Sequence, residues 1–328
     1  MAEVFVNRTD EYYKNIRSVR EMMDNELTIS HILRSENSYT ASGLPYGRIL
    51  ASRLKPSENQ SILEIGPGLG DLAENLCSSL ANFSYTFADI SFDVIKNLMS
   101  RFRKGRFSFV TGDFLSISFR ERFDLIICNE VLADFPTIIN MTMDRPKIRK
   151  GDEDAYYDAV SLIKSYRLPF QGVSNFNYGA LKFLEKAKAS LAEGGRIFIC
   201  EHSSAKPSRI GVFGHNEYTI DFSILERAAE KIKFKLIEKG NLTKLLGIKD
   251  RKAILFYMQP ELKMLYNFFR KRGILIDQRP YPAEEITAIL ANNGVGFSDR
   301  KKYAIFLEKH SKPLSRITDQ FNYLILGT

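Results

Sequence analysis

Three glycines at alternate positions follow an apolar stretch that contains an acid. Residues 61–65, Ser-Ile-Leu-Glu-Ile, form a short run typical of a strand buried on both faces. Gly66, Gly68 and Gly70 come next, and residues 71–76 begin a helical pattern with acids in its first turn. A strand, a glycine loop and a helix in this order make the first half of a nucleotide-binding crossover. Glycines there let a ligand lie against the loop backbone.

The spacing of the glycines distinguishes two kinds of loop. A dinucleotide loop needs a further glycine three residues after Gly68, where this chain has Asp71. The observed pattern, Glu64 followed by glycine at every second position from Gly66, resembles motif I of the class I methyltransferases, which use S-adenosylmethionine. A glycine-rich turn without a ligand is the alternative. The resemblance implies this cofactor and assigns to its site Glu64, Gly66, Pro67, Gly68 and Gly70.

A second acid lies where a nucleotide-binding sheet holds the ribose. Residues 85–89 predict a second strand that ends in Asp89, and Ile90 follows it. A carboxylate at this strand end accepts hydrogen bonds from both ribose hydroxyl groups. We therefore assign Asp89 and Ile90 to the cofactor site. The alternative role of Asp89 is to cap the helix that begins near Ser91.

A third strand, residues 107–110, is followed by Gly112, Asp113 and Phe114. In class I methyltransferases an acid at this place faces the adenine amino group, and an aromatic residue beside it stacks on the ring. The resemblance adds these three residues to the cofactor site. A plain Gly-Asp turn is the alternative.

Polar side chains follow the fourth predicted strand, residues 123–128. Asn129 and Glu130 come directly after it, and Asp134 lies a few residues further on. Ligands of an open α/β sheet bind beyond the carboxyl ends of its strands, so we expect the chemistry here. The candidate catalytic residues are Glu130, Asn129 and Asp134, with Asn129 also facing the cofactor and Glu201, after a fifth strand, as a further carboxylate.

The remaining pattern completes one large α/β fold. Buried-strand runs recur at residues 196–200, 234–238 and 321–326, and helical spacing of apolar residues separates the strands. We expect a doubly wound, mostly parallel, seven-stranded Rossmann-like methyltransferase sheet with helical insertions. Helices are predicted within residues 10–34, 46–54, 155–166, 178–191, 222–229, 242–272 and 282–292, while residues 303–308 fit a helix or a strand.

The predicted organisation has two parts. Residues 1–37 form an N-terminal helical segment, and residues 38–328 form the methyltransferase domain with insertions at about 138–176 and 242–315. Long insertions in compact domains are often functional, so we expect the first one to cover the site.

Composition limits the partners. Hydrophobic residues make up 44% of the chain and charged residues 26%, as in ordinary globular proteins. The net charge of +8 permits an acidic partner. The short basic runs at 145–150, 270–272 and 300–302 are typical of solvent-exposed surfaces, so nucleic acid is not the expected partner. No apolar run reaches membrane-spanning length and no secretory leader is visible, which favours the cytoplasm and no membrane partner.

Cysteine and histidine spacing gives no metal or disulfide pattern. Methyl transfer from a sulfonium is a direct displacement that depends on alignment rather than on a Lewis acid. We therefore predict no metal. The cysteines, which are predicted to be buried apolar side chains, are Cys77, Cys128 and Cys200. The histidines are His31, His202, His215 and His310.

Several stretches together resemble one branch of the class I enzymes, the MidA-like family, whose mitochondrial members methylate an arginine during assembly of respiratory complex I. The resemblance runs from about residue 38 to 248 and implies that Tyr39 and Thr40 join the cofactor site. One position departs from the pattern: the family's acid four residues after its asparagine is Ala133 here, and Asp134 is next to it. The stretches that carry the resemblance are residues 38–50, 63–68, 89–91, 129–130, 217–229 and 242–248.

The predicted function is methyl transfer from S-adenosylmethionine to a protein arginine. Glu130 is expected to hold two guanidinium nitrogens and to aim the third at the methyl carbon. The alternative for Glu130 is a helix cap or an ion pair with a lysine. The alternative functions are methylation of a small molecule or RNA, and a cofactor-binding assembly factor without catalysis. The expected partner is a protein substrate, and the chain is compatible with a homodimer.

Overall fold

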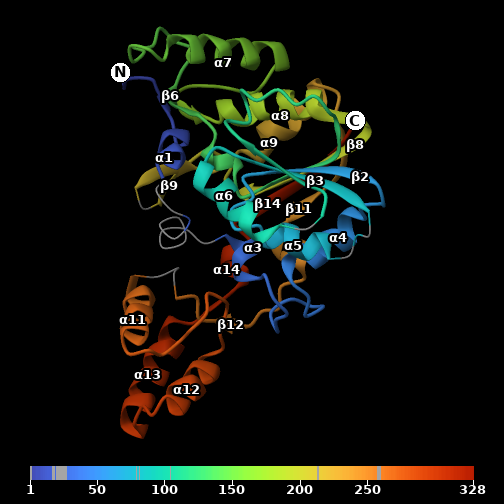
Figure 1. The fold of residues 1–328 in the computed structure, drawn as a ribbon. Helices are drawn as coiled ribbons and strands as arrows, with labels where there is room; N and C mark the ends of the chain where they lie inside the picture. Colours follow the sequence, from blue (N-terminus) through green and yellow to red (C-terminus); the bar gives the residue numbers. More distant parts are fainter. Residues whose placement is uncertain are drawn as a thin grey trace.

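The computed structural model describes residues 2–16, 19, 28–78, 80, 82–103, 105–212, 214–256 and 260–328. Its centre is a seven-stranded sheet with the order β11-β14-β8-β5-β2-β3-β4 (Figure 1). Neighbours from β4 to β8 are parallel, and β14 runs antiparallel to both β8 and β11. The predicted fold class is therefore confirmed. The strands are β2 (Gln60–Ile65), β3 (Phe83–Asp89), β4 (Phe107–Thr111), β5 (Phe123–Asn129), β8 (Leu191–His202), β11 (Lys235–Asn241) and β14 (Phe321–Gly327).

Successive strand residues point to opposite faces of the sheet and fill two cores. Leu63 and Ile126 belong to one cluster, while their neighbours Ile62 and Leu125 belong to the other, and all four are fully buried. The fully apolar runs seen in the sequence follow from this covering of both faces.

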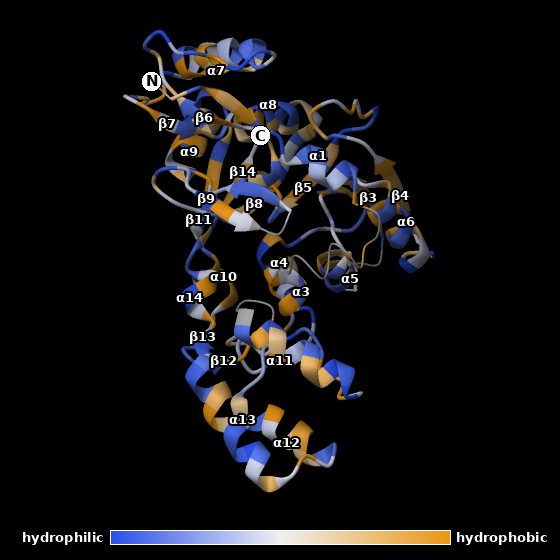
Figure 2. Ribbon diagram, turned by 90° about the vertical axis from the view of Figure 1, so that its left-hand side faces the viewer, coloured by the Kyte–Doolittle hydropathy of each residue, from blue (hydrophilic) through white to orange (hydrophobic). Residues whose placement is uncertain are grey.

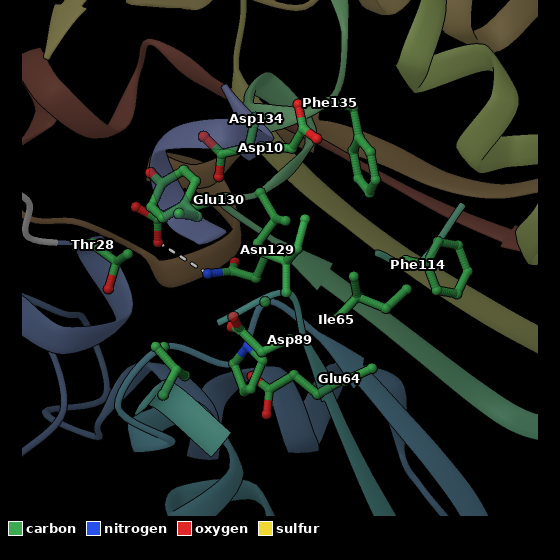
Figure 3. A pocket seen from close by; sticks show the side chains of 18 of the residues that line it. Asp10, Thr28, Glu64, Ile65, Asp89, Phe114, Asn129, Glu130, Asp134 and Phe135 are labelled. Atoms are coloured by element: carbon green, nitrogen blue, oxygen red, sulfur yellow. Dashed lines mark hydrogen bonds between the residues drawn. The ribbon is translucent and has the colours of Figure 1, made fainter. Parts of the chain in front are cut away.

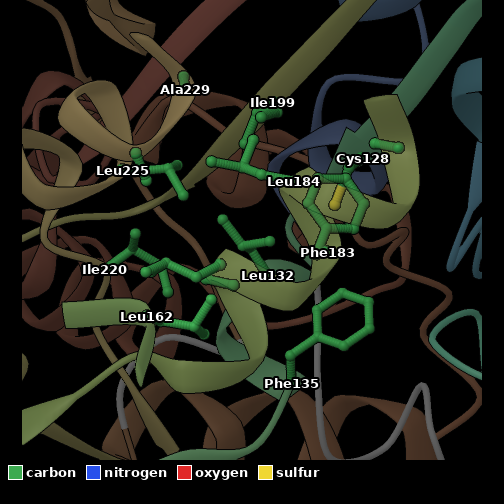
Figure 4. Packing of buried hydrophobic residues seen from close by; sticks show 14 of the residues in the cluster. Cys128, Leu132, Phe135, Leu162, Phe183, Leu184, Ile199, Ile220, Leu225 and Ala229 are labelled. Atoms are coloured by element: carbon green, nitrogen blue, oxygen red, sulfur yellow. The ribbon is translucent and has the colours of Figure 1, made fainter. Parts of the chain in front are cut away.

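Helices cover each face of this sheet. One face packs against α7 (Glu153–Tyr166), α8 (Tyr178–Ser190) and α9 (Phe222–Lys231). Figure 4 shows this core, where Phe183 and Leu184 of α8 lie near Cys128 of β5 and Ile199 of β8. The other face packs against α4 (Tyr46–Leu54), α5 (Asp71–Cys77), α6 (Phe92–Arg101) and α10 (Leu242–Leu246).

The N-terminal segment contains a strand as well as helices. β1 (Phe5–Asn7) pairs with β6 (Thr137–Met141), which also pairs with β7 (Ser174–Phe176), so the first insertion and the N-terminus share a small sheet. The helices of this segment are α1 (Asp10–Lys14) and α3 (Ile29–Ile32), and the part of the predicted helix over residues 20–27 lies outside the described residues. A hairpin of β9 (Arg209–Val212) and β10 (His215–Tyr218) follows β8.

The second insertion forms a lobe that projects from the sheet domain (Figures 1 and 2). We call residues 252–313 the C-terminal lobe. Ten buried apolar residues between Ile254 and Leu307 give it a hydrophobic cluster of its own. Its elements are β12 (Lys252–Ala253), α11 (Pro260–Lys271), α12 (Ala283–Asn292), α13 (Phe297–His310) and β13 (Lys312–Pro313), and α14 (Ser315–Thr318) leads back to β14.

The continuous helix predicted over residues 242–272 is wrong. α10 ends at Leu246 because Gly247 adopts the left-handed conformation, with φ of 59°. Ile254 then forms a bridge with Tyr281, so the apolar residues between the two helices are buried through pairing rather than through a helix face. Residues 303–308, which fitted either structure, are helical within α13.

The described residues include no helix that is both long and apolar enough to cross a lipid bilayer.

Candidate active site

The glycine loop forms one wall of a pocket at the carboxyl ends of the strands. Gly66, Gly68 and Gly70 all have left-handed backbone, with φ of 59°, 53° and 79°. A Cβ on Gly66 would lie 2.4 Å from a methyl carbon of Val131, and one on Gly70 would lie 2.6 Å from the ring of Phe102. A Cβ on Gly68 would have no neighbour within 4 Å among the described residues. Internal packing explains two of these glycines, and Gly68 leaves space that a ligand can occupy.

Glu64 lies under this loop. It lines the pocket, is 3% exposed, and accepts a hydrogen bond of 2.8 Å from the hydroxyl group of Tyr85. Burial raises the pKa of Glu64 to about 8, although the Tyr85 hydrogen bond opposes this shift. A buried carboxyl group at a pocket wall needs polar partners, which the polar groups of a bound cofactor supply.

Asp89 and Ile90 line the same pocket after β3. One carboxylate oxygen of Asp89 accepts a 2.7 Å hydrogen bond from the backbone N–H of Ser91. Ser91 itself caps α6, since its hydroxyl oxygen accepts from the backbone N–H of Val94. Burial raises the pKa of Asp89 to about 7, against the hydrogen bond from Ser91. The capping role proposed as the alternative therefore belongs to Ser91, and Asp89 is placed to receive ribose hydroxyl groups.

The turn after β4 also borders the pocket, with Gly112, Asp113 and Phe114 all lining it. Both carboxylate oxygens of Asp113 accept hydrogen bonds within the turn, one from the Leu115 N–H at 3.0 Å and one from the Ser116 hydroxyl at 3.0 Å. Phe114 is 3% exposed. Asp113 therefore stabilises the turn through its carboxylate and also lines the pocket.

Asn129, the last residue of β5, and Glu130 after it face the pocket from the opposite side (Figure 3). The Asn129 side chain accepts a 2.6 Å hydrogen bond from the hydroxyl group of Tyr46 and donates one of 2.9 Å to Glu130. The Glu130 carboxylate also accepts from the backbone N–H groups of Ile29 and Ser30, at 2.7 and 3.3 Å. Burial raises the pKa of Glu130 to about 7, and these three hydrogen bonds oppose the shift.

The backbone of Glu130 is in the left-handed region, with φ of 57°. Such a conformation is uncommon in a residue with a side chain and is found preferentially at functional sites. The alternative in which Glu130 caps the next helix differs from the structure, where its carboxylate receives the first N–H groups of α3, an earlier helix of the chain.

A group of polar side chains lies beyond Glu130. Asp134 lines the pocket, and its carboxylate lies near His215 and Glu217 of β10, with one ligand atom from each within 4.8 Å of the others. His215 Nε2 is 2.8 Å from a Glu217 carboxylate oxygen, and the ring of Tyr12 stacks on the imidazole at 4.3 Å. Such a group of side chains can hold a cation. The negative charge of Glu217 also contributes to the raised pKa of Glu130, after the larger effect of burial. The predicted absence of a metal stays a prediction.

Four predicted residues lie outside this pocket. Tyr39 and Thr40 are buried in the loop before α4, where Thr40 pairs with Ile248 and its hydroxyl group donates to the Leu44 carbonyl. Gly70 is the N-cap residue of α5. Glu201 is also buried; it accepts hydrogen bonds from the backbone N–H groups of Ala133 and His202, and burial raises its pKa to about 8. The assignments of Tyr39, Thr40, Gly70 and Glu201 to direct ligand contact are therefore not supported by their positions.

The N-terminal segment, rather than the first insertion, completes the pocket wall, so the prediction that residues 138–176 cover the site is not supported. His31 of α3 is 2.6 Å from Asp71, which also binds Arg101 at 2.9 Å. Burial opposes ionisation of Asp71, but His31 and Arg101 outweigh it and lower the pKa of Asp71. The lining residues missed from the sequence are Asp10, Tyr13, Thr28, Ser30, His31 and Asp71, together with several neighbours of the predicted residues.

Comparison with known families agrees with this geometry. A family described as methyltransferase domain matches residues 62–142, which extend from β2 into β6 and contain the glycine loop, Asp89, Asp113, Glu130 and Asp134. Residues 62–142 are therefore a methyltransferase domain, and the protein is a methyltransferase. Its cofactor is S-adenosylmethionine, and the pocket fits this cofactor because it combines open space at Gly68 with carboxyl groups at three strand ends.

Individual relatives of this methyltransferase are distant. A malonyl-acyl-carrier-protein O-methyltransferase of Priestia megaterium is 32% identical over 78 residues, which are 24% of this chain and 28% of that enzyme. A ribosomal RNA small subunit methyltransferase A of Prochlorococcus marinus is 24% identical over 254 residues, 71% of this chain and 82% of that protein. The crystal structure of the cyclase SpnF matches 100% of this chain and 99% of its own with a TM-score of 0.52 and 13% identity, which shows a shared fold.

Proposed function

We propose that this methyltransferase modifies an arginine side chain of a protein substrate. The observation that supports the proposal is the collection of acids on one side of the pocket. Asp10, Glu130 and Asp134 line the pocket, and Figure 3 shows them together on the side away from Glu64 and Asp89. Acids that are not needed for the cofactor favour an acceptor with a positive charge.

A guanidinium group fits this surface. It is charged at any working pH, and its planar nitrogens donate to carboxylates in fixed directions. Delocalisation makes its nitrogens poor nucleophiles, so orientation and removal of a proton are what the protein must supply. A carboxyl group whose pKa is raised to about 7, as in Glu130, is a better proton acceptor than an ordinary glutamate.

The existing hydrogen bonds of the Glu130 carboxylate limit how many guanidinium nitrogens it can receive. A carboxylate offers about four acceptor positions, and Ile29, Ser30 and Asn129 already donate to it. One position is left, so Glu130 can receive a single guanidinium nitrogen. The proposal therefore assigns the second nitrogen to Asp134, which lines the same pocket.

The cofactor supplies an activated methyl group on its sulfonium, so the protein has to bind, align and shield the reactants. In this proposal the glycine loop, Asp89 and Asp113 hold the cofactor. Asn129 fixes the orientation of Glu130 through its 2.9 Å hydrogen bond. The proposal includes no metal. It places the protein in the reducing cytoplasm, and the three free cysteines agree with such a compartment.

The MidA-like branch is part of this proposal. Asn129 ends β5 and Glu130 follows it, as that resemblance requires, and Gly247 caps the end of α10 within the matching stretch of residues 242–248. The alternative of an assembly factor without catalysis predicts cofactor binding with no turnover.

RNA is the second candidate acceptor. It is favoured by the similarity to a ribosomal RNA small subunit methyltransferase A over 71% of this chain. The carboxylates beside the pocket argue against it, because they would repel the phosphates that flank a target base.

The acceptor is tested by labelling. Tritiated S-adenosylmethionine and purified protein are added to a lysate of cells that lack the protein, and labelled fractions are digested with protease or ribonuclease and analysed by mass spectrometry. Label on arginine supports the proposal. Label only in RNA or in a metabolite rejects the arginine acceptor, and cofactor binding without label on any acceptor supports the assembly factor.

A further inference from the structure

Much of the net charge of the chain lies in the C-terminal lobe. Residues 252–313 contain 11 Lys and Arg and 6 Asp and Glu, so they contribute +5 of the total of +8 from less than a fifth of the sequence. The sheet domain, whose pocket is acidic, is therefore close to neutral. This asymmetry indicates that the lobe and the pocket meet groups of opposite charge.

Two basic runs account for much of this charge. Residues 270–272 end α11, and residues 300–302 lie near the start of α13. Cations at a helix C-terminus favour the helix dipole, which explains the first run without a ligand. The second run is near a helix N-terminus, where the dipole disfavours cations. Lys302 is 3.6 Å from Asp299 of the same helix, but the helix dipole favours neither Arg300 nor Lys301.

Exposed aromatic rings accompany both runs. Phe268 is 38% exposed and its ring lies 4.5 Å from the guanidinium carbon of Arg272. Phe297 is 76% exposed and lies 5.8 Å from that of Arg300. An arginine beside an exposed ring forms a platform on which an unstacked nucleic-acid base can stack, while the cation meets the phosphate.

A membrane surface fits these features less well. A helix that lies on a membrane presents a continuous apolar stripe to the lipid. The apolar side of α11 instead faces the core of the lobe, because Leu262 and Phe269 are 0% and 1% exposed. Polar and apolar residues are mixed along α11 and α13, as their colours in Figure 2 show, and the exposed apolar pair of Met264 and Phe268 is only one turn long.

The lobe is connected to the wall of the methyltransferase pocket. Arg34, which follows α3, binds the Gln278 carbonyl at 2.7 Å and the Asp277 carboxylate at 2.5 Å. His31, which lines the pocket, is 3.0 Å from the side chain of Gln278. A ligand bound to the C-terminal lobe therefore lies on a part of the molecule that contacts the pocket wall directly.

We propose that the C-terminal lobe binds single-stranded RNA through its basic runs and the rings of Phe268 and Phe297. RNA commonly presents unpaired bases in loops and bulges, which such rings require. The proposal is independent of the acceptor: an RNA-bound protein carrying the target arginine and an RNA acceptor are both compatible with it.

The test is fluorescence anisotropy of a labelled 20-nucleotide single-stranded RNA with the full chain at several salt concentrations. Changing Lys271, Lys301 and Lys302 to glutamine should lower the slope of log affinity against log salt by about 2. Phe268→Ala combined with Phe297→Ala should weaken binding about tenfold or more. The matched control changes the exposed lysines Lys96, Lys150 and Lys231 to glutamine and should leave both quantities unchanged.

The proposal is overturned if the wild-type chain does not bind the RNA, or if the control weakens binding as much as the lobe variants. It is also overturned if anionic lipid vesicles bind the chain while RNA does not. Duplex DNA of the same length should bind at least tenfold more weakly, because its bases are not available for stacking. Calorimetry with S-adenosylmethionine should give the same affinity for all variants, which separates this outcome from failure of the pocket assignment.

Discussion

Glu130 combines a left-handed backbone, a buried carboxyl group and contacts with a segment 100 residues away. In the proposed reaction it orients one guanidinium nitrogen and stabilises the departing proton. Glu130→Gln removes the charge while retaining the size. We expect turnover to fall about a hundredfold, as for loss of one preorganised electrostatic group, with cofactor affinity nearly unchanged.

The same substitution places an amide against the N–H groups of α3, so unfolding must be measured alongside turnover. A loss of about 1–3 kcal/mol in the free energy of unfolding is expected from the unsatisfied group. Glu130→Asp, which keeps the charge, should recover part of the turnover, and the exposed Glu58→Gln should behave as wild type. Wild-type turnover in Glu130→Gln would rule out this role.

We expect Asp89 to make cofactor binding dependent on pH. Its pKa is raised to about 7 by burial, and ribose hydroxyl groups that donate to it favour the ionised form. The dissociation constant should therefore fall as pH rises from 6 to 8, with release of protons measured by calorimetry in buffers of different ionisation enthalpy. Asp89→Asn should bind more weakly with less dependence on pH; an unchanged pH profile would contradict the ribose assignment.

Buried acids with raised pKa values also affect stability in the absence of cofactor. Glu64 and Glu201 have pKa values of about 8, above the ordinary value of 4.5. The folded state then binds more protons than the unfolded state between these values, so stability decreases as pH rises through this range. Glu64 lines the pocket and Glu201 lies near it. Cofactor binding should therefore offset part of this decrease in stability.

At the scale of elements, α3 is held between two acids. Its first N–H groups bind Glu130, and His31 binds Asp71, which also binds Arg101. Asp71→Asn removes the buried carboxylate that binds both His31 and Arg101, and we expect the free energy of unfolding to fall by about 1–3 kcal/mol. Cofactor affinity should fall too, because α3 forms part of the pocket wall.

Glu74→Gln is the matched control. Glu74 binds the same Arg101 side chain, but its own side chain is 61% exposed, so its contribution should be within about 1 kcal/mol. Equal effects of the two substitutions in denaturant unfolding would show that α3 is not anchored through Asp71.

The sequence predicts the strand ends well, because buried strands have a clear pattern and the candidate residues lie at or near their carboxyl ends. This set lines the pocket: Glu64, Asp89, Asp113, Asn129, Glu130 and Asp134. Tyr39 and Thr40 were assigned through a resemblance, and packing of their loop against Ile248 and Lys249 keeps them from the pocket.

Contacts between distant segments account for the other differences. The N-terminal residues of the pocket wall lie far from the motifs they meet, and no local pattern marks them. Glu201 lies near the carboxyl end of β8, but backbone N–H groups of Ala133 and His202 bind its carboxylate in the interior. The bridge between Ile254 and Tyr281 interrupts the helix predicted from spacing.

The whole molecule consists of a sheet domain and a lobe that projects from it (Figure 1). Acids line one side of the pocket in the sheet domain, and the lobe is basic. The central claim is that S-adenosylmethionine binds at the carboxyl ends of the strands, over the glycine loop. Gly68 offers the sharpest test, because a side chain there meets no protein atom within 4 Å among the described residues. Gly172 has a similar φ of 67° and similar open space but does not line the pocket, so it controls for backbone strain.

The measurement is the dissociation constant of S-adenosylmethionine for three purified proteins by titration calorimetry: wild type, Gly68→Val and Gly172→Val. Strain at a left-handed position costs about 1–2 kcal/mol in each variant, so their unfolding should be similar. We predict one site in the wild type, an unchanged constant in Gly172→Val, and at least tenfold weaker binding in Gly68→Val. Equal affinity of Gly68→Val and the wild type would contradict the placement of the cofactor on this loop.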